Sequence, residues 1–206
     1  PNFQREFIWK KSRIIKLLEN ILSCKPIGGL LIWKSSINLT SKGVSITDEK
    51  KSNLYVLDGQ QRLTALYIIM KAKLPYYYTK KEVEKTLKEF QIIIDFKNFP
   101  EYELLFKEKI TNPTNQIKVS DLLLDGYDYE GIDNKYYRLC IDLRSNFTKK
   151  EIHYEQFEGD DVATAISIFD DINTAGIKLT GAELLLAYIS AYWGTARDEM
   201  KKAQEK

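Results

Sequence analysis

From residue 54 to residue 71 the chain reads LYVLDGQQRLTALYIIMK. Its first four residues are apolar, and this pattern predicts a buried strand over residues 54–57. Apolar residues then recur at helical spacing, so a helix is expected from residue 60 or 61 to about residue 73. Four of them are expected to share one face of this helix: Leu63, Leu66, Tyr67 and Met70. A strand that runs directly into a helix indicates a mixed α/β arrangement.

Five polar or turn residues, Asp58 to Arg62, lie between these two elements. Backbone N–H groups at the start of a helix favour an anion, and glycine lets a phosphate approach the backbone closely. Arg62 can bind phosphate oxygens in a forked geometry, while Asp58 can hold Mg²⁺ or orient a water molecule. Gln60 and Gln61 can position water or read a base edge. The alternative is an ordinary capped turn, but a turn requires less polarity than this, and the excess favours function.

Upstream of this motif, a helix is expected over residues 12–23 with Ser12 as its N-cap, and a strand over residues 30–33. The segment 26–29, Pro-Ile-Gly-Gly, separates the two. Downstream, the expected elements are a short helix over 80–89, a strand over 90–96, a hairpin partner at 104–106, a strand or helical turn at 119–123, a helix over 135–145, a strand over 152–156, a helix over 160–173, and a further helix opened by a capping box at Thr180–Glu183. The helix over 160–173 carries its apolar side at Val162, Ile166, Phe169 and Ile172.

The composition is that of a folded domain, with 44% hydrophobic and 29% charged residues and a net charge of +2. Residues 1–34 carry a local charge of +5, and residues 121–134 carry −5. These stretches are typical of solvated faces, so contact with nucleic acid would depend on local patches.

Several common types of site are poorly supported. Cys24 and Cys140 have no disulfide or zinc-binding spacing and fit a reducing, intracellular setting. The only histidine, His153, falls in an expected strand, where a lone histidine is more often structural than catalytic. One histidine is too few, or wrongly spaced, for a Cys–His protease, a histidine-based zinc site or an HNH nuclease centre. The P-loop signature for nucleotide binding is also absent from the sequence. No segment approaches the ~20 apolar residues of a membrane helix, and both chain ends look cut, as in a fragment of a longer protein.

Two further motifs combine polar residues with apolar neighbours. Gln4 and Arg5 lie among aromatic residues in the segment 3–9, which favours a fixed position over a flexible terminus, although simple aromatic packing explains it too. Residues 169–179 form an expected turn between helices, where Gly176 suits a C-cap. A C-cap at Gly176 does not explain why Asn173 should be a special position.

At these motifs the sequence resembles the N-terminal domain of GmrSD-type, modification-dependent restriction enzymes and related phage-defence proteins, the DGQQR family. The matching segments are Pro1–Trp9, Pro26–Ile27, Asp58–Thr64 and Phe169–Leu184, in the family's order and spread over nearly the whole chain.

The resemblance implies an α+β (mixed α/β) fold with a ParB/sulfiredoxin-like core over residues 1–110 and a mainly helical portion over 111–206. It implies binding and hydrolysis of a nucleoside triphosphate with Mg²⁺. The residues expected to act in catalysis are Asp58, Gln60, Gln61 and Arg62, with Asp58 also as the metal ligand. Those expected to bind nucleotide are Gln4, Arg5, Gly59, Arg62, Asn173 and Gly176. The implied partners are modified or foreign DNA and an HNH-type nuclease domain in cis or in trans, in the cytoplasm and away from membranes.

The leading hypothesis is therefore a magnesium-dependent NTPase domain that couples nucleotide state to DNA restriction. A non-catalytic module that binds DNA or senses its modification would instead show DNA affinity that needs no nucleotide and falls steeply with salt. A metal-dependent nuclease built on Asp58 and nearby glutamates would nick DNA by itself. A protein-interaction domain leaves the Gln-Arg motifs unexplained.

Overall fold

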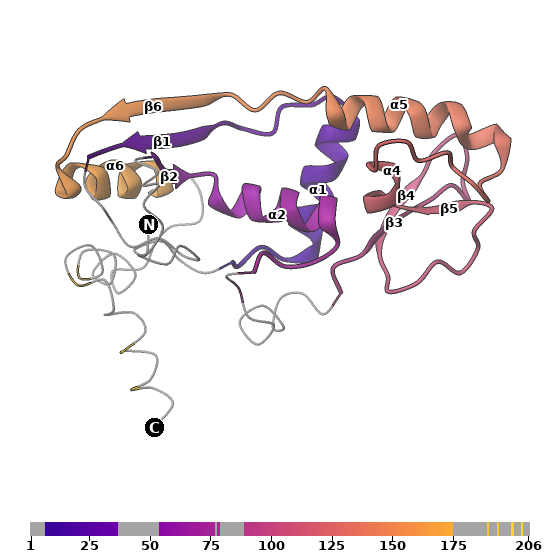
Figure 1. The fold of residues 1–206 in the computed structure, drawn as a ribbon, viewed down its shortest axis with the longest axis horizontal. Helices are drawn as coiled ribbons and strands as arrows, with labels where there is room; N and C mark the ends of the chain where they lie inside the picture. The colour runs from indigo at the N-terminus through magenta and orange to yellow at the C-terminus, as the bar shows by residue number, and fades with distance from the viewer. Residues whose placement is uncertain are drawn as a thin grey trace. The chain divides into compact units, whose positions relative to one another are not determined.

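The computed structural model describes residues 7–36, 54–76, 78 and 89–174, together with residues 189, 193, 199 and 203. These residues form helices and two three-stranded sheets, so the α+β prediction is confirmed (Figure 1). The chain divides into two compact units, and each has its own hydrophobic core. Unit 1 comprises residues 1–6, 29–60 and 153–206, and unit 2 comprises residues 7–28 and 61–152. The boundary at residues 60 and 61 falls inside the Asp58–Arg62 motif.

Unit 1 is built on a sheet with the strand order β2-β1-β6. Strand β1 (Leu30–Lys34) pairs antiparallel with β2 (Leu54–Asp58) and parallel with β6 (Tyr154–Glu158). Helix α6 (Val162–Thr174) covers one face of this sheet. The core between them comprises Trp33, Tyr55, Leu57, Val162, Ala165, Ile166 and Phe169. The three strands and the helix were expected from the sequence, and β6 begins two residues later than predicted.

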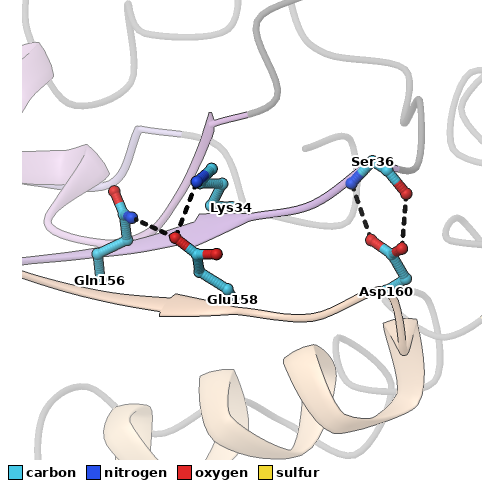
Figure 2. A network of polar contacts seen from close by, with 5 residues as sticks. All are labelled: Lys34, Ser36, Gln156, Glu158 and Asp160. Carbon is cyan, nitrogen blue, oxygen red and sulfur yellow. Dashed lines mark hydrogen bonds and ion pairs between the residues drawn. The ribbon is translucent and has the colours of Figure 1, made fainter.

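Polar contacts join β1 to the end of β6 and to the segment that follows it (Figure 2). Glu158 accepts hydrogen bonds from Lys34 (Nζ to Oε1, 2.9 Å) and Gln156 (3.2 Å). Asp160 accepts from the backbone N–H of Ser36 (2.8 Å), from the Ser36 hydroxyl (2.6 Å) and from the Ser35 hydroxyl (2.9 Å). The bonds from Lys34 and Ser36 hold the pKa values of Glu158 and Asp160, respectively, below their ordinary range. Both carboxylates therefore stay ionised and tether the two strands.

Unit 2 contains the second sheet, with the order β4-β3-β5 and antiparallel pairing throughout. Its strands are β3 (Ile92–Asp95), β4 (Glu103–Phe106) and β5 (Gln116–Lys118), and the predicted hairpin of β3 with β4 is confirmed. Its helices are α1 (Lys11–Leu22), α2 (Gln60–Lys71, from Gln61 onward), α4 (Val119–Leu122), the 3₁₀ helix η1 (Asn134–Tyr136) and α5 (Tyr137–Thr148).

Two local predictions in unit 2 were wrong. Helix α2 buries Thr64, Ala65, Ile68 and Ile69, whereas Met70, one of the residues expected on its apolar face, is exposed. Apolar residues occur all around this helix, so the pattern alone does not define its inner face. Helix α1 begins one residue earlier than expected, which makes Lys10 and not Ser12 the N-cap, without a side-chain cap bond.

The expected helix over 80–89 lies outside the described residues except for Glu89, and so does the capping box at Thr180–Glu183. The ParB/sulfiredoxin-like relationship and the division near residue 110 stay predictions. In the part of the chain that the structure describes, no helix is long and apolar enough to cross a membrane.

Candidate functional site

The Asp58–Arg62 motif forms the predicted turn from strand to helix. Strand β2 ends at Asp58, and helix α2 begins at Gln60. Gly59 between them is buried and has a φ of 93°. This backbone conformation is disfavoured for residues with a Cβ atom, so the turn requires glycine for a steric reason.

A β-bulge sets the direction of Asp58. Leu31 pairs with Asp58 and Ile32 pairs with Val56, which leaves Leu57 as an extra residue on β2. Leu57 packs into the core beneath α6, and strict alternation would turn Asp58 to the opposite face. The bulge instead places Asp58 opposite Leu31, whose side chain packs against the same core. Asp58 is thereby directed to the face of the sheet that α6 covers.

A pocket of about 380 Å³ opens on this face within unit 1. It is lined by Asp58, by Gly29, Leu30 and Leu31 at the start of β1, by residues 153–155 at the start of β6, and by Ile172 of α6. The Asp58 side chain is half-buried, and its carboxylate has no hydrogen-bond or ion-pair partner among the described residues. No described residue therefore occupies its oxygens.

The second half of the motif lies in unit 2, where Arg62 meets the loop between α1 and β1. Gly28 in this loop has a φ of 80°, and a Cβ atom added to it would lie 2.8 Å from Nη2 and 3.3 Å from Cζ of Arg62. The guanidinium group thus lies directly against the backbone at a position that only glycine leaves open. The sequence predicts that the Pro-Ile-Gly-Gly segment ends a helix, and in the structure its Gly28 also contacts Arg62.

Gln61 connects the motif to the amino-terminal segment. Its side-chain oxygen Oε1 accepts a hydrogen bond from the backbone N–H of Ile8 (2.9 Å). Ile8 lies three residues after Arg5, and the neighbouring Phe7 is buried in the core of unit 2. The amino-terminal motif and the Asp58–Arg62 motif are therefore joined through a specific contact.

The structure brings together parts of the predicted site within each unit. In unit 1, Asp58 shares a pocket with Ile172, the neighbour of Asn173 in the 169–179 motif. In unit 2, Gln61 and Arg62 contact the segments that follow Arg5 and Ile27. Three predicted site residues, Gln4, Arg5 and Gly176, lie outside the described residues, as does the side chain of Asn173.

Sequence reasoning missed His153 and Glu155, which line the pocket with Asp58. His153 was expected to be structural, and Glu155 was not considered. The parallel pairing of β6 with β1 brings them to the pocket, because it aligns the starts of these strands. A sequence shows a strand but not the partner that it pairs with, so no signal within 152–156 could have revealed this position.

The charged stretches are partly neutralised by local partners. In the basic stretch, Lys11 pairs with Glu89, Lys16 with Glu19 and Lys34 with Glu158, and Arg13 lies over the ring of Trp9. In the acidic stretch, Asp121, Asp125 and Asp133 pair with Lys118, Arg144 and Lys135, respectively. Within the described residues, no group of three or more His, Cys, Asp or Glu side chains is placed to hold a metal ion by itself.

Comparison with known proteins supports the resemblance seen in the sequence. The uncharacterized protein MJ0686 of Methanocaldococcus jannaschii is 24% identical to the chain over 226 aligned positions, which cover 91% of this chain and 38% of the relative. The chain thus spans well under half the length of this relative. The family model described as the GmrSD restriction endonuclease, N-terminal domain, matches residues 1–190. Since this match covers most of the chain, the chain belongs to the family of GmrSD restriction endonuclease N-terminal domains.

Proposed function

We propose that this domain binds a nucleoside triphosphate at the Asp58–Arg62 motif and hydrolyses it, and that the nucleotide state controls DNA cleavage by a separate nuclease domain. The observation that carries the proposal is the local geometry of the motif. One short turn holds a carboxylate in a pocket with no partner among the described residues, a glycine with positive φ, the start of a twelve-residue helix, and an arginine that lies against the backbone of Gly28. Together these groups supply what phosphoryl transfer needs, namely positioning and neutralisation of charge.

In this proposal each residue of the motif has a separate role. Arg62 binds phosphate oxygens, and the backbone N–H groups at the start of α2 bind the same anion. Gln61 already uses its carbonyl oxygen to hold the segment after Arg5, so it positions the amino-terminal motif. Gln60 is then the glutamine that orients the attacking water. Gln4, Arg5, Asn173 and Gly176 complete the nucleotide site in this proposal.

Asp58 fits the metal that accompanies a nucleoside triphosphate. Mg²⁺ in such sites is held by one or two carboxylates together with phosphate oxygens and water, so a complete cage of protein ligands is not needed. A half-buried carboxylate that has no partner among the described residues is suited to this role. The ion, when bound, would neutralise phosphate charge.

Membership of the family supports the proposed coupling to DNA cleavage. The family is that of restriction endonuclease N-terminal domains, and the chain covers 38% of its relative MJ0686. We therefore assign cleavage of modified or foreign DNA to an HNH-type nuclease domain in cis or in trans.

Phosphate release by the purified domain with Mg²⁺ and each of the four ribonucleoside triphosphates tests the proposal. The wild type is expected to release phosphate, and Asp58→Asn and Arg62→Ala are each expected to reduce turnover by at least about 100-fold, as loss of one transition-state contact typically does. Binding of a non-hydrolysable analogue separates the two roles, because Arg62→Ala should weaken affinity directly.

Arg138 and Asp142 provide matched controls, since they form an exposed i,i+4 pair on α5. Arg138→Ala and Asp142→Asn change the same residue types and should leave turnover unchanged. Equal phosphate release by all five proteins would refute a catalytic role for the motif. DNA affinity that needs no nucleotide, together with an absence of phosphate release, would instead support a non-catalytic DNA-sensing module.

A further inference from the structure

Glu155 and Asp58 lie in one row across the sheet of unit 1. Both pair with Leu31, Asp58 from β2 on one side and Glu155 from β6 on the other. Paired residues direct their side chains to the same face, so both carboxylates project on the side of α6. Two strand spacings separate their backbones by about 10 Å. The pocket is therefore lined by two carboxylates whose strands flank β1 on opposite sides.

The chemistry of these walls does not suit a bare phosphate. Among the described residues, the ionisable lining consists of the carboxylates of Asp58 and Glu155 and the imidazole of His153, with no lysine or arginine, and the Glu155 carboxylate has no partner there. On the α6 side of the sheet the apolar lining consists of Leu31, which pairs with Glu155, and Ile172 of α6. A carboxylate accepts hydrogen bonds only, so it requires a ligand that presents donors without negative charge. A sugar meets this need, because its hydroxyls donate to the carboxylate while its carbon atoms contact the apolar wall.

We propose that Glu155 binds the ribose hydroxyls of the nucleotide and makes the site selective for ribonucleotides over 2′-deoxyribonucleotides. This inference rests on the proposed function. Asp58 adjoins the Gly59 turn and so lies at the phosphate end, while Glu155, two strands away, lies at the sugar end. In dinucleotide-binding folds a carboxylate likewise accepts a hydrogen bond from the ribose 2′-hydroxyl.

Calorimetric titration with two non-hydrolysable triphosphate analogues, one with ribose and one with 2′-deoxyribose, tests the inference. The wild type is expected to bind the ribose form about 10-fold more tightly, as expected for a hydrogen bond to a charged group. Glu155→Ala should remove this preference and leave affinity for the deoxy form unchanged. Glu155→Gln, which keeps one acceptor oxygen, should retain part of the preference.

Glu158→Ala is the matched control, because Glu158 lies on the same strand but pairs with Lys34 away from the pocket. It should keep the full preference for ribose. Equal affinity of the wild type for the two analogues would refute the role of Glu155 and leave the nucleotide site intact. A preference that persists in Glu155→Ala would also refute it. Absence of binding of either analogue to the wild type would refute the proposed function and this inference together.

Discussion

The guanidinium group of Arg62 occupies the space next to Gly28 that a side chain would otherwise fill. A Cβ atom on Gly28 would lie 2.8 Å from Nη2 of Arg62, closer than a carbon and a nitrogen approach without displacement. Gly28 also has a φ of 80°, a conformation in which a Cβ atom is strained. The loop before β1 is therefore part of the proposed phosphate site, although it contributes no polar side chain to it.

The first prediction is that Gly28→Ala weakens nucleotide binding by displacing Arg62. The end of an arginine side chain can move, so the contact itself costs little stability, and only the strain of positive φ, about 1 kcal/mol, should appear in the free energy of unfolding. Affinity for a non-hydrolysable triphosphate should fall about 10-fold, because the guanidinium no longer points at the phosphate. Calorimetric titration and urea denaturation measure the two effects separately.

Gly126→Ala is the matched control, since Gly126 has a φ of 74° and a Cβ atom there would meet nothing within 4 Å. It should lose similar stability and keep full affinity. In an Arg62→Ala background, Gly28→Ala should cause no further loss of affinity. An equal loss in both backgrounds would show that Gly28 acts independently of Arg62.

The second prediction separates two residues of the apolar stripe on α6. Ile166 is fully buried, whereas Ile172 is 37% exposed and lines the pocket. Ile166→Ala should therefore lower the free energy of unfolding by about 2–5 kcal/mol, and Ile172→Ala by less than about 1 kcal/mol. Chemical denaturation measures both. A cost of Ile172→Ala as large as that of Ile166→Ala would mean that Ile172 belongs to the core.

The apolar stripe on α6 shows which part of residue burial can be predicted from a sequence pattern. Helical periodicity predicted α6 and three of its buried residues, Val162, Ile166 and Phe169. It also included Ile172, because periodicity defines a face of a helix but not the length over which a sheet covers that face. In α2 the apolar residues lie on all sides, and the expected face was wrong for the same physical reason: burial is decided by the neighbouring elements.

The candidate site likewise has features that the sequence predicts and features that it does not. The strand, the turn and the helix around Asp58 were predictable, since local polarity and backbone preferences determine them. The bulge at Leu57, the parallel pairing that brings Glu155 to the pocket and the contact of Arg62 with Gly28 depend on pairing between distant segments. These relationships arise from tertiary structure and leave no local signal in a single sequence.

The third prediction concerns the two cysteines. Cys24 is exposed, while Cys140 is fully buried in the core of unit 2, and burial raises the pKa of its thiol to about 11. A thiol must ionise and be accessible to react, so DTNB at pH 8 should modify one thiol per chain rapidly and the second only when urea is added. Cys24→Ser should abolish the rapid phase. Rapid modification of two thiols in the folded wild type would contradict the burial of Cys140.

The last prediction concerns acid stability and Asp160. Hydrogen bonds from the hydroxyl and the backbone N–H of Ser36, and then from the hydroxyl of Ser35, hold the Asp160 pKa below its ordinary value of 3.8. A carboxyl whose folded-state pKa is lowered stabilises the fold above its unfolded-state pKa, and this contribution is lost as pH falls through the folded-state pKa. Asp160→Asn should therefore be less stable than the wild type at pH 7 and should lose less stability between pH 5 and pH 2. Urea midpoints at these pH values measure the difference. Ser36→Ala removes one donor, so its loss of stability on acidification should lie between those of the wild type and Asp160→Asn. If Asp160→Asn loses as much stability as the wild type between pH 5 and pH 2, the hydrogen bonds to Asp160 do not contribute to acid stability.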